Sequence, residues 1–221
     1  MGHMRIYKYI HSCFLLEKDN NKILIDPGPF TFIENKVKPE DFQNINAILI
    51  THQHYDHYDP EAIKIILSNN SDCQIFTNQS TSEVLKEVGI DSEILEKGVK
   101  QIANFEVKAF FAEHEPLPLP LPPNTAFLID DLFLHPGDSF DKSIFKTKAK
   151  VLALPVAAPW LNIMQSLEFV SQYKPEHVLP AHDGFIKDFF IKGQYGLWDK
   201  ILAEKQMKFH KLDDPGKSME I

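Results

Sequence analysis

Short apolar stretches separated by polar turns run along the chain and predict alternating strands and helices. In the first half, strands are expected at 5–10, 13–17, 22–26, 47–50 and 74–77, with helices at 60–67 and 80–88. The second half predicts strands at 101–112, 125–129, 132–134, 151–154 and 177–180, and helices at 163–173, 185–191 and 197–210. This order predicts two sheets packed face to face with helices outside, an α/β sandwich.

The chain length and its ends suggest one folded unit. A length of 221 residues without a low-complexity linker suits a single domain, expected at 4–212. Residues 1–3 resemble a cloning remnant before a native start at Met4, which removes His3 from the candidate chemistry. Residues 213–221 are polar and are expected to form a frayed tail.

Composition narrows the functional classes. The chain is 43% hydrophobic and has no apolar run near the roughly 18 residues of a membrane span, so a soluble cytoplasmic protein is expected. A net charge of −8 and a single arginine, Arg5, argue against nucleic acid as a partner. Cys13 and Cys73 are too few for a disulfide framework and are expected to be reduced core thiols.

A histidine-rich segment follows the apolar stretch 47–50. It places His52, His54, Asp56 and His57 within six residues. In an extended backbone His52 and His54 point to one side and can bind one ion, whereas Asp56 and His57 diverge toward a second. Imidazole and carboxylate ligands together suit zinc, manganese or iron. The segment therefore predicts a metal site at the carboxyl end of a buried strand.

The segment also matches the HxHxDH motif of the metallo-β-lactamase superfamily, and other segments extend the resemblance. Residues 23–28 (ILIDPG) resemble the early strand that ends in a structural aspartate, residues 135–138 (HPGD) a later Gly-Asp motif, and residues 179–182 (LPAH) the final histidine motif. His114 falls where that family supplies another histidine. Within the superfamily, residues 11–16 and 57–60 look similar to ascorbate-6-phosphate lactonases, phosphatidylethanolamine-type phospholipases D and small hydrolases.

The resemblance implies a four-layer αββα sandwich of two mixed sheets and a dinuclear site. It assigns His52, His54 and His114 to one metal ion and Asp56, His57 and His182 to the other, with Asp138 bridging them. Asp26 would stand behind these ligands and orient the motif loop. Asp56 would also act in catalysis, by accepting a proton or orienting a hydroxide. Two divalent ions are implied, zinc first, with manganese or iron as alternatives.

These features predict a hydrolase that acts on an ester, lactone or phosphoester of a small molecule through a hydroxide held by two metal ions. Two alternatives stay open. One is a phosphodiesterase or nuclease of the same fold, and the other is a non-catalytic metal-binding or redox-sensing member. The substrate, the native metal and the oligomeric state do not follow from the sequence.

Three neighbouring features have open roles. His11 is either a structural histidine or a residue behind the metal ligands. Trp160 is either part of a substrate wall or lid, or a core aromatic. Residues 115–124 hold five prolines, which cannot form a central strand. We expect this segment to form a rigid wall beside the site; a surface loop or a ligand for a proline-recognising domain are the alternatives.

Overall fold

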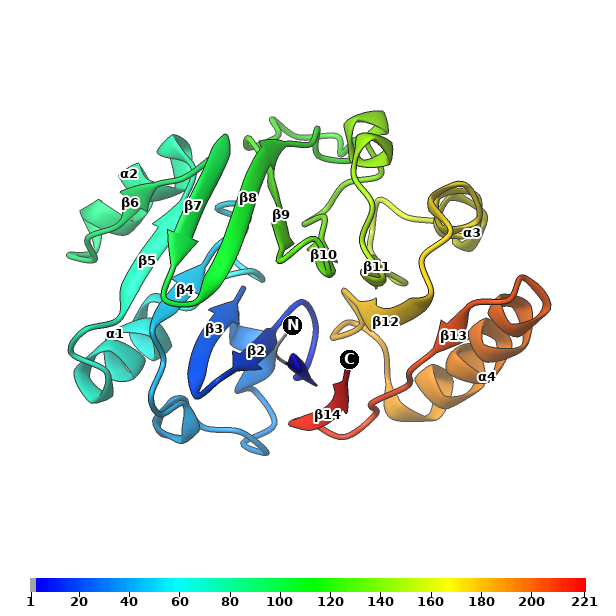
Figure 1. The fold of residues 1–221 in the computed structure, drawn as a ribbon, viewed down its shortest axis with the longest axis horizontal. Helices are drawn as coiled ribbons and strands as arrows, with labels where there is room; N and C mark the ends of the chain where they lie inside the picture. The colour runs from blue at the N-terminus through cyan, green and yellow to red at the C-terminus, as the bar shows by residue number, and fades with distance from the viewer. Residues whose placement is uncertain (1–2) are drawn as a thin grey trace.

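The computed structural model describes residues 3–221, so Met1 and Gly2 of the expected remnant lie outside the described residues. The described chain forms two mixed seven-stranded sheets (Figure 1). The first has the order β14 (Lys217–Glu220), β1 (Arg5–Lys8), β2 (Phe14–Lys18), β3 (Asn21–Ile25), β4 (Ala47–Leu49), β5 (Gln74–Thr77) and β6 (Glu93–Ile94). The second has the order β13 (Lys208–Phe209), β12 (His177–Ala181), β11 (Val151–Pro155), β10 (Phe133–His135), β9 (Thr125–Ile129), β8 (Phe105–Phe111) and β7 (Gly98–Ile102).

Helices cover the outer face of each sheet. Helices α1 (Pro60–Asn69) and α2 (Gln79–Glu87) lie beside the first sheet, and α3 (Ile163–Tyr173) and α4 (Asp188–Glu204) beside the second (Figure 1). Side chains of α1 and α2 share one apolar cluster with the first sheet, and those of α3 and α4 share another with the second. The expected αββα sandwich is therefore confirmed.

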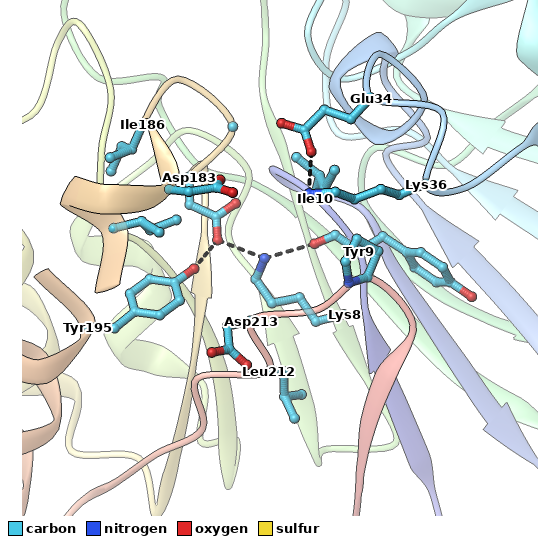
Figure 2. Close-up of a pocket in the computed structure, with 14 residues that line it drawn as sticks. Lys8, Tyr9, Ile10, Glu34, Lys36, Asp183, Ile186, Tyr195, Leu212 and Asp213 are labelled. Atoms are coloured by element: carbon cyan, nitrogen blue, oxygen red, sulfur yellow. Dashed lines mark hydrogen bonds and ion pairs between the residues drawn. The ribbon is translucent and has the colours of Figure 1, made fainter. Parts of the chain in front are cut away.

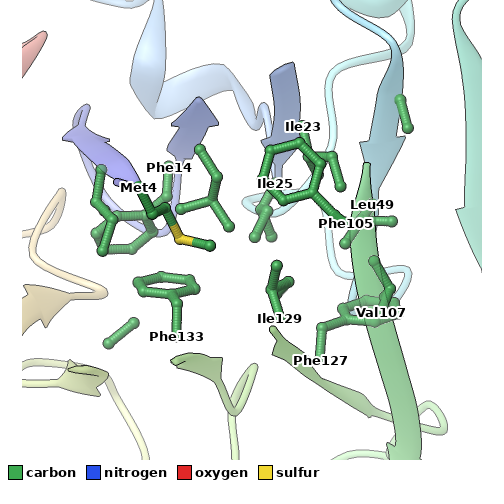
Figure 3. Packing of buried hydrophobic residues seen from close by; sticks show 14 of the residues in the cluster. Met4, Phe14, Ile23, Ile25, Leu49, Phe105, Val107, Phe127, Ile129 and Phe133 are labelled. Carbon is green, nitrogen blue, oxygen red and sulfur yellow. The ribbon is translucent and has the colours of Figure 1, made fainter. Parts of the chain in front are cut away.

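A third apolar cluster fills the space between the sheets and explains why the strands read as they do. On β3, Ile23 and Ile25 point into this inter-sheet core, whereas Leu24 packs on the helical side. Figure 3 shows Ile25 and Phe14 of the first sheet opposite residues such as Phe133 of the second. Because the strand is buried on both faces, its sequence is a continuous apolar run rather than an alternating one.

Parallel strands bring the candidate residues to one edge of the sandwich. In the first sheet β3, β4 and β5 pair in parallel, and in the second β10, β11 and β12 do. Asp26 follows β3 directly, and His182 follows β12 directly. The histidine-rich segment follows β4, and Asp138 follows β10. The carboxyl ends of both parallel groups thus supply the candidate ligands other than His114, which follows the antiparallel strand β8.

Three expectations about local structure were wrong. The stretch 101–112 was expected to be one strand but includes the turn of a hairpin, β7–β8. The turn was missed because Ala103, and not a glycine, adopts its left-handed conformation (φ 50°). Instead of the two helices expected at 185–191 and 197–210, residues 188–204 form one helix, α4. The packing of Tyr195 and Trp198 in the core offsets the weak helix propensity of the glycines in this helix. The tail predicted to fray at 213–221 contains β14, which pairs with β1 and forms backbone hydrogen bonds along the side of β1 that would otherwise be the edge of the sheet.

Among residues 3–221, no helix is both long enough and apolar enough to cross a membrane.

Candidate metal centre

The loop after β4 is held in shape by Asp26. This carboxylate accepts hydrogen bonds from the Thr51 backbone N–H (2.8 Å) and the Thr51 hydroxyl (2.7 Å), and it lies 2.8 Å from His57 Nδ1. Gly28 allows the close approach of the two segments, since a Cβ there would lie 2.0 Å from the Asp56 carbonyl oxygen. The loop therefore depends on both Asp26 and Gly28, which lie just after β3.

The first of two candidate metal clusters consists of His52, His54, His114 and Asp138, whose ligand atoms all lie within 4.8 Å of one another. His54 Nδ1 is 3.0 Å from His52 Nε2 and 3.1 Å from His114 Nε2. An oxygen of Asp138 lies 3.6 Å from His114 Nε2. We call this set the first cluster.

Hydrogen bonds outside the first cluster indicate which ring nitrogens face inward as acceptors. His114 Nδ1 lies 2.6 Å from the Glu115 carbonyl oxygen, to which it must donate. His52 Nδ1 lies 3.0 Å from the Thr51 hydroxyl, whose own proton goes to Asp26. The Nε2 atoms of His52 and His114 therefore present lone pairs to the centre, as metal-binding histidines do.

Burial also keeps the histidines of the first cluster neutral. It lowers the pKa of His52, His54 and His114, and neighbouring imidazoles lower it further. The Nε2 lone pairs of His52 and His114 both face His54 Nδ1, which carries at most one proton. The first cluster is therefore suited to a cation.

The second candidate cluster consists of His11, Asp56, His57 and His182. His182 Nε2 lies 3.4 Å from an oxygen of Asp56 and 3.0 Å from an oxygen of Asp138, while His57 Nε2 lies 3.1 Å from the other Asp138 oxygen. Asp138 therefore contacts histidines of both clusters. Within residues 3–221, His57 Nε2, His182 Nε2 and Asp138 Oδ1 are buried without an aligned hydrogen bond. These atoms are available as ligands for a metal ion.

Carboxylates change the charges of the second cluster. Burial alone would lower the pKa of His182, but Asp138 outweighs it and raises this pKa to about 9. For His57, burial is likewise outweighed by Asp138 and Asp26, and the pKa lies well above its usual value. Burial would raise the pKa of Asp56, but hydrogen bonds from His11 and His182 lower it overall. Without metal, this cluster holds protons where a cation would sit.

His11 enters the second cluster from the loop between β1 and β2. Its Nδ1 accepts a hydrogen bond from the Gly184 N–H (3.1 Å), so the ring proton is on Nε2, which lies 3.1 Å from Asp56 Oδ2. Burial, followed by the neighbouring His182, lowers the pKa of His11 to about 4 and keeps the ring neutral. In this tautomer His11 donates to Asp56 and has no lone pair for a metal ion.

A buried ionic network fixes the backbone around His11. Asp183 accepts a hydrogen bond from the His11 N–H (2.9 Å), and it pairs with Lys8 (2.7 Å) and the hydroxyl of Tyr195. Figure 2 shows Lys8 and Tyr195 both directed at the Asp183 carboxylate. The His182 N–H also reaches the His11 carbonyl oxygen at 3.2 Å. The network ties the loop that bears His11 to the loop that bears His182.

A cavity of about 270 Å³ opens over both clusters. The ligand candidates among its lining residues are His54, Asp56, Asp138 and His182; the others are Tyr55, Leu117, Leu119, Pro159, Trp160 and Phe185. Trp160 lines the cavity and donates a hydrogen bond from Nε1 to Asp138 Oδ2 (3.2 Å), so it lies in the site rather than in the core. Leu117 and Leu119 of the proline-rich segment 115–124 line the cavity, which places this part of the segment beside the site.

The structure brings together all seven residues that the sequence suggested as metal ligands, with Asp26 behind His57. The sequence left the role of His11 open, and its contact with Asp56 joins segments far apart in the chain. Asp183 was missed altogether. Its position directly after His182 is the only signal that could have pointed to it.

Comparisons with known proteins agree with this geometry. Residues 5–182 match the model of a family described as the β-lactamase superfamily domain. Protein Rv0786c of Mycobacterium tuberculosis is 28% identical over 194 residues, covering 83% of this chain and 85% of that protein. A UPF0173 metal-dependent hydrolase of Nanoarchaeum equitans is 24% identical over 231 residues, covering 96% of this chain and 94% of that protein.

A solved structure supports the fold. A metallo hydrolase from the archaeon Ignicoccus hospitalis superposes with a TM-score of 0.74 at 21% identity, covering 99% of this chain and 98% of that one. At this identity the likeness concerns the fold alone. The family match spans most of the chain and includes every candidate ligand. The chain therefore belongs to the metallo-β-lactamase superfamily.

Proposed function

We propose that this protein is a metal-dependent hydrolase with two divalent ions, acting on an ester, lactone or phosphoester of a small molecule. The observation that carries the proposal is the pair of adjacent clusters that share Asp138 beneath one open cavity. Relatives named as metal-dependent hydrolases support it. The finer resemblance to ascorbate-6-phosphate lactonase-like proteins remains a prediction.

The donor atoms decide which residues would hold each ion. His52, His54 and His114 would hold one, and Asp56, His57 and His182 the other, with Asp138 between them. When bound, two such ions supply activated water and positive charge that stabilises an oxygen of the substrate as negative charge develops. Imidazole and carboxylate ligands suit zinc best, and manganese or iron also fit them.

The protein's own groups orient this site. Asp26 holds the ring of His57, while the carbonyl oxygens of Ala157 and Glu115 hold those of His182 and His114. The Asp56 carboxylate accepts a hydrogen bond from His11 Nε2–H and has a lowered pKa, so it stays ionised at neutral pH. The ionised Asp56 can therefore accept a hydrogen bond from a water molecule and orient it on the floor of the cavity.

Metal depletion tests the proposal. The protein is stripped with a chelator and reloaded with zinc, manganese or iron. Elemental analysis then gives the metal content, and turnover is assayed on lactone, carboxylic ester and phosphodiester substrates. We expect turnover to disappear on depletion and return on reloading. The variant His54→Ala should lose the metal ion of the first cluster. It should also lose turnover, while its circular dichroism spectrum stays unchanged. Undiminished turnover in the metal-free protein would refute the proposal.

A further inference from the structure

The cavity above the two clusters differs sharply in character between its floor and its sides. The floor consists of the candidate ligands, and the sides are formed by Tyr55, Leu117, Leu119, Pro159, Trp160 and Phe185. These six residues come from four separate segments of the chain. The reacting group of a substrate would lie on the floor, and the rest of the substrate would lie against the sides.

Large apolar side chains are exposed where the cavity opens. Tyr55, Leu119 and Phe185 are exposed by 66%, 70% and 42%. Phe30 packs between two of them, with its ring centroid 6.3 Å from that of Tyr55 and 4.9 Å from that of Phe185. Scattered exposed apolar residues are ordinary, but several that converge on one opening from separate segments mark a binding surface.

The cavity sides carry no positive charge. Among residues 3–221, neither lysine nor arginine lines this cavity. The polar group of Trp160 is already engaged with Asp138. A phosphate or carboxylate away from the reacting centre would lose its hydration without gaining a charged partner there. The lining therefore disfavours sugar phosphates and other substrates with an anionic tail.

On these grounds we infer that the substrates are neutral carboxylic esters or lactones of small molecules, whose apolar acyl or alkyl part packs against Tyr55, Leu119 and Phe185. This inference rests on the proposed hydrolase function and narrows its substrate class. A volume of about 270 Å³ lies just below the range of roughly 300–1,000 Å³ for ligand pockets, which suits a short chain or one ring.

A matched substrate series tests the inference on the zinc-loaded protein. From p-nitrophenyl acetate to butyrate, kcat/KM should rise about 15-fold, which is about 0.8 kcal/mol for each added methylene. A second comparison uses p-nitrophenyl hexanoate and mono-p-nitrophenyl adipate, which have acyl chains of the same length; the adipate chain ends in a carboxylate. The adipate should react at least about 10-fold more slowly, because its charge meets apolar walls. Equal rates for the two, or a preference for p-nitrophenyl phosphate, would overturn the inference.

Two leucines of the proline-rich segment provide a matched pair of variants. Leu119 lines the cavity, whereas Leu121 is also exposed but does not line it. Leu119→Asp should abolish the gain with chain length and leave the metal content unchanged, and Leu121→Asp should behave as wild type. Leu119→Lys should raise the adipate rate relative to hexanoate about 5-fold, as expected for an exposed ion pair of about 1 kcal/mol. Identical behaviour of the two aspartate variants would contradict the inference.

A binding measurement separates this inference from the hydrolase proposal. N-hexylacetamide resists hydrolysis, and its binding can be followed through the fluorescence of Trp160, while Trp198 is fully buried and serves as a constant background. We expect saturable binding to both metal-free and zinc-loaded protein, weakened by Leu119→Asp and not by Leu121→Asp. If this binding is seen but esters, lactones and phosphoesters are all left unhydrolysed by the zinc-loaded protein, the hydrolase proposal fails and the apolar site stands. Absence of binding refutes the apolar site.

Discussion

The first and second clusters share Asp138 but differ in how they are built and charged. The first takes His52 and His54 from one short loop, and burial keeps its imidazoles neutral. The second gathers His11 and His182 from segments far apart in the chain, and carboxylates keep His57 and His182 protonated without metal. A metal ion can bind the first cluster directly, but it must displace protons from the second. The two ions should therefore load with different pH dependence.

Removing the shared carboxylate should have the largest effect. Asp138→Ala takes a ligand from both clusters, so we expect loss of both ions and of turnover by more than the roughly 100-fold typical of outer-shell changes. Elemental analysis and kinetics measure it, with the exposed Asp91→Ala as control. If one ion stays fully bound in Asp138→Ala, the carboxylate is not shared.

Single ligands should separate the clusters. We expect His54→Ala and His182→Ala each to retain half of the wild-type metal content. His182→Ala should also destabilise the metal-free protein by about 3 kcal/mol, which is the lower end of the range for breaking a buried ion pair. The lower end applies because Asp138 still pairs with His57 in this variant. Urea denaturation measures the difference, and the more exposed His54 should show little. Equal destabilisation by both variants would mean that the clusters do not differ in charge.

The charged histidines predict a pH dependence for the metal-free protein. Because the pKa of His182 is raised from 6.5 to about 9 in the folded state, the stability that it contributes is complete below pH 6.5. This contribution, about 3 kcal/mol, falls as the pH rises from 6.5 toward about 9. Denaturation at a series of pH values checks it, with the metal-loaded protein as control. A metal-free protein that is equally stable across this range would contradict the assignment.

The smallest effect should come from His11. The variant His11→Asn tolerates the left-handed backbone (φ 65°) and keeps the backbone bonds to Asp183 and His182, but its side chain is too short to reach Asp56. We expect metal affinity to fall about 10-fold at the second cluster only, as for a lost outer partner. Calorimetric titration resolves the two sites, and the first cluster is the internal control. Complete loss of the second ion would instead make His11 a ligand.

The sequence predicted the parts of this protein that depend on neighbouring residues. The apolar stretch at 47–50 and the ligands that follow it are close in the chain, so strand, loop and the chelating pair His52 and His54 follow from local geometry. Strands at 74–77 and 125–129 and the helix at 163–173 were predicted with correct bounds, because turn residues and periodicity delimit them.

Tertiary structure decided the rest, because those features depend on distances between segments remote in sequence. The tail became β14 only because the edge of β1 was open beside it. The proton of the His11 ring is on Nε2 because Nδ1 accepts a hydrogen bond from Gly184, which is remote in sequence. The cavity has apolar sides because the packing of the two sheets against each other brings Tyr55, Leu119 and Phe185 to one opening. The sequence determined which residues can bind metal, and the packing of the sheets decided what lies around them.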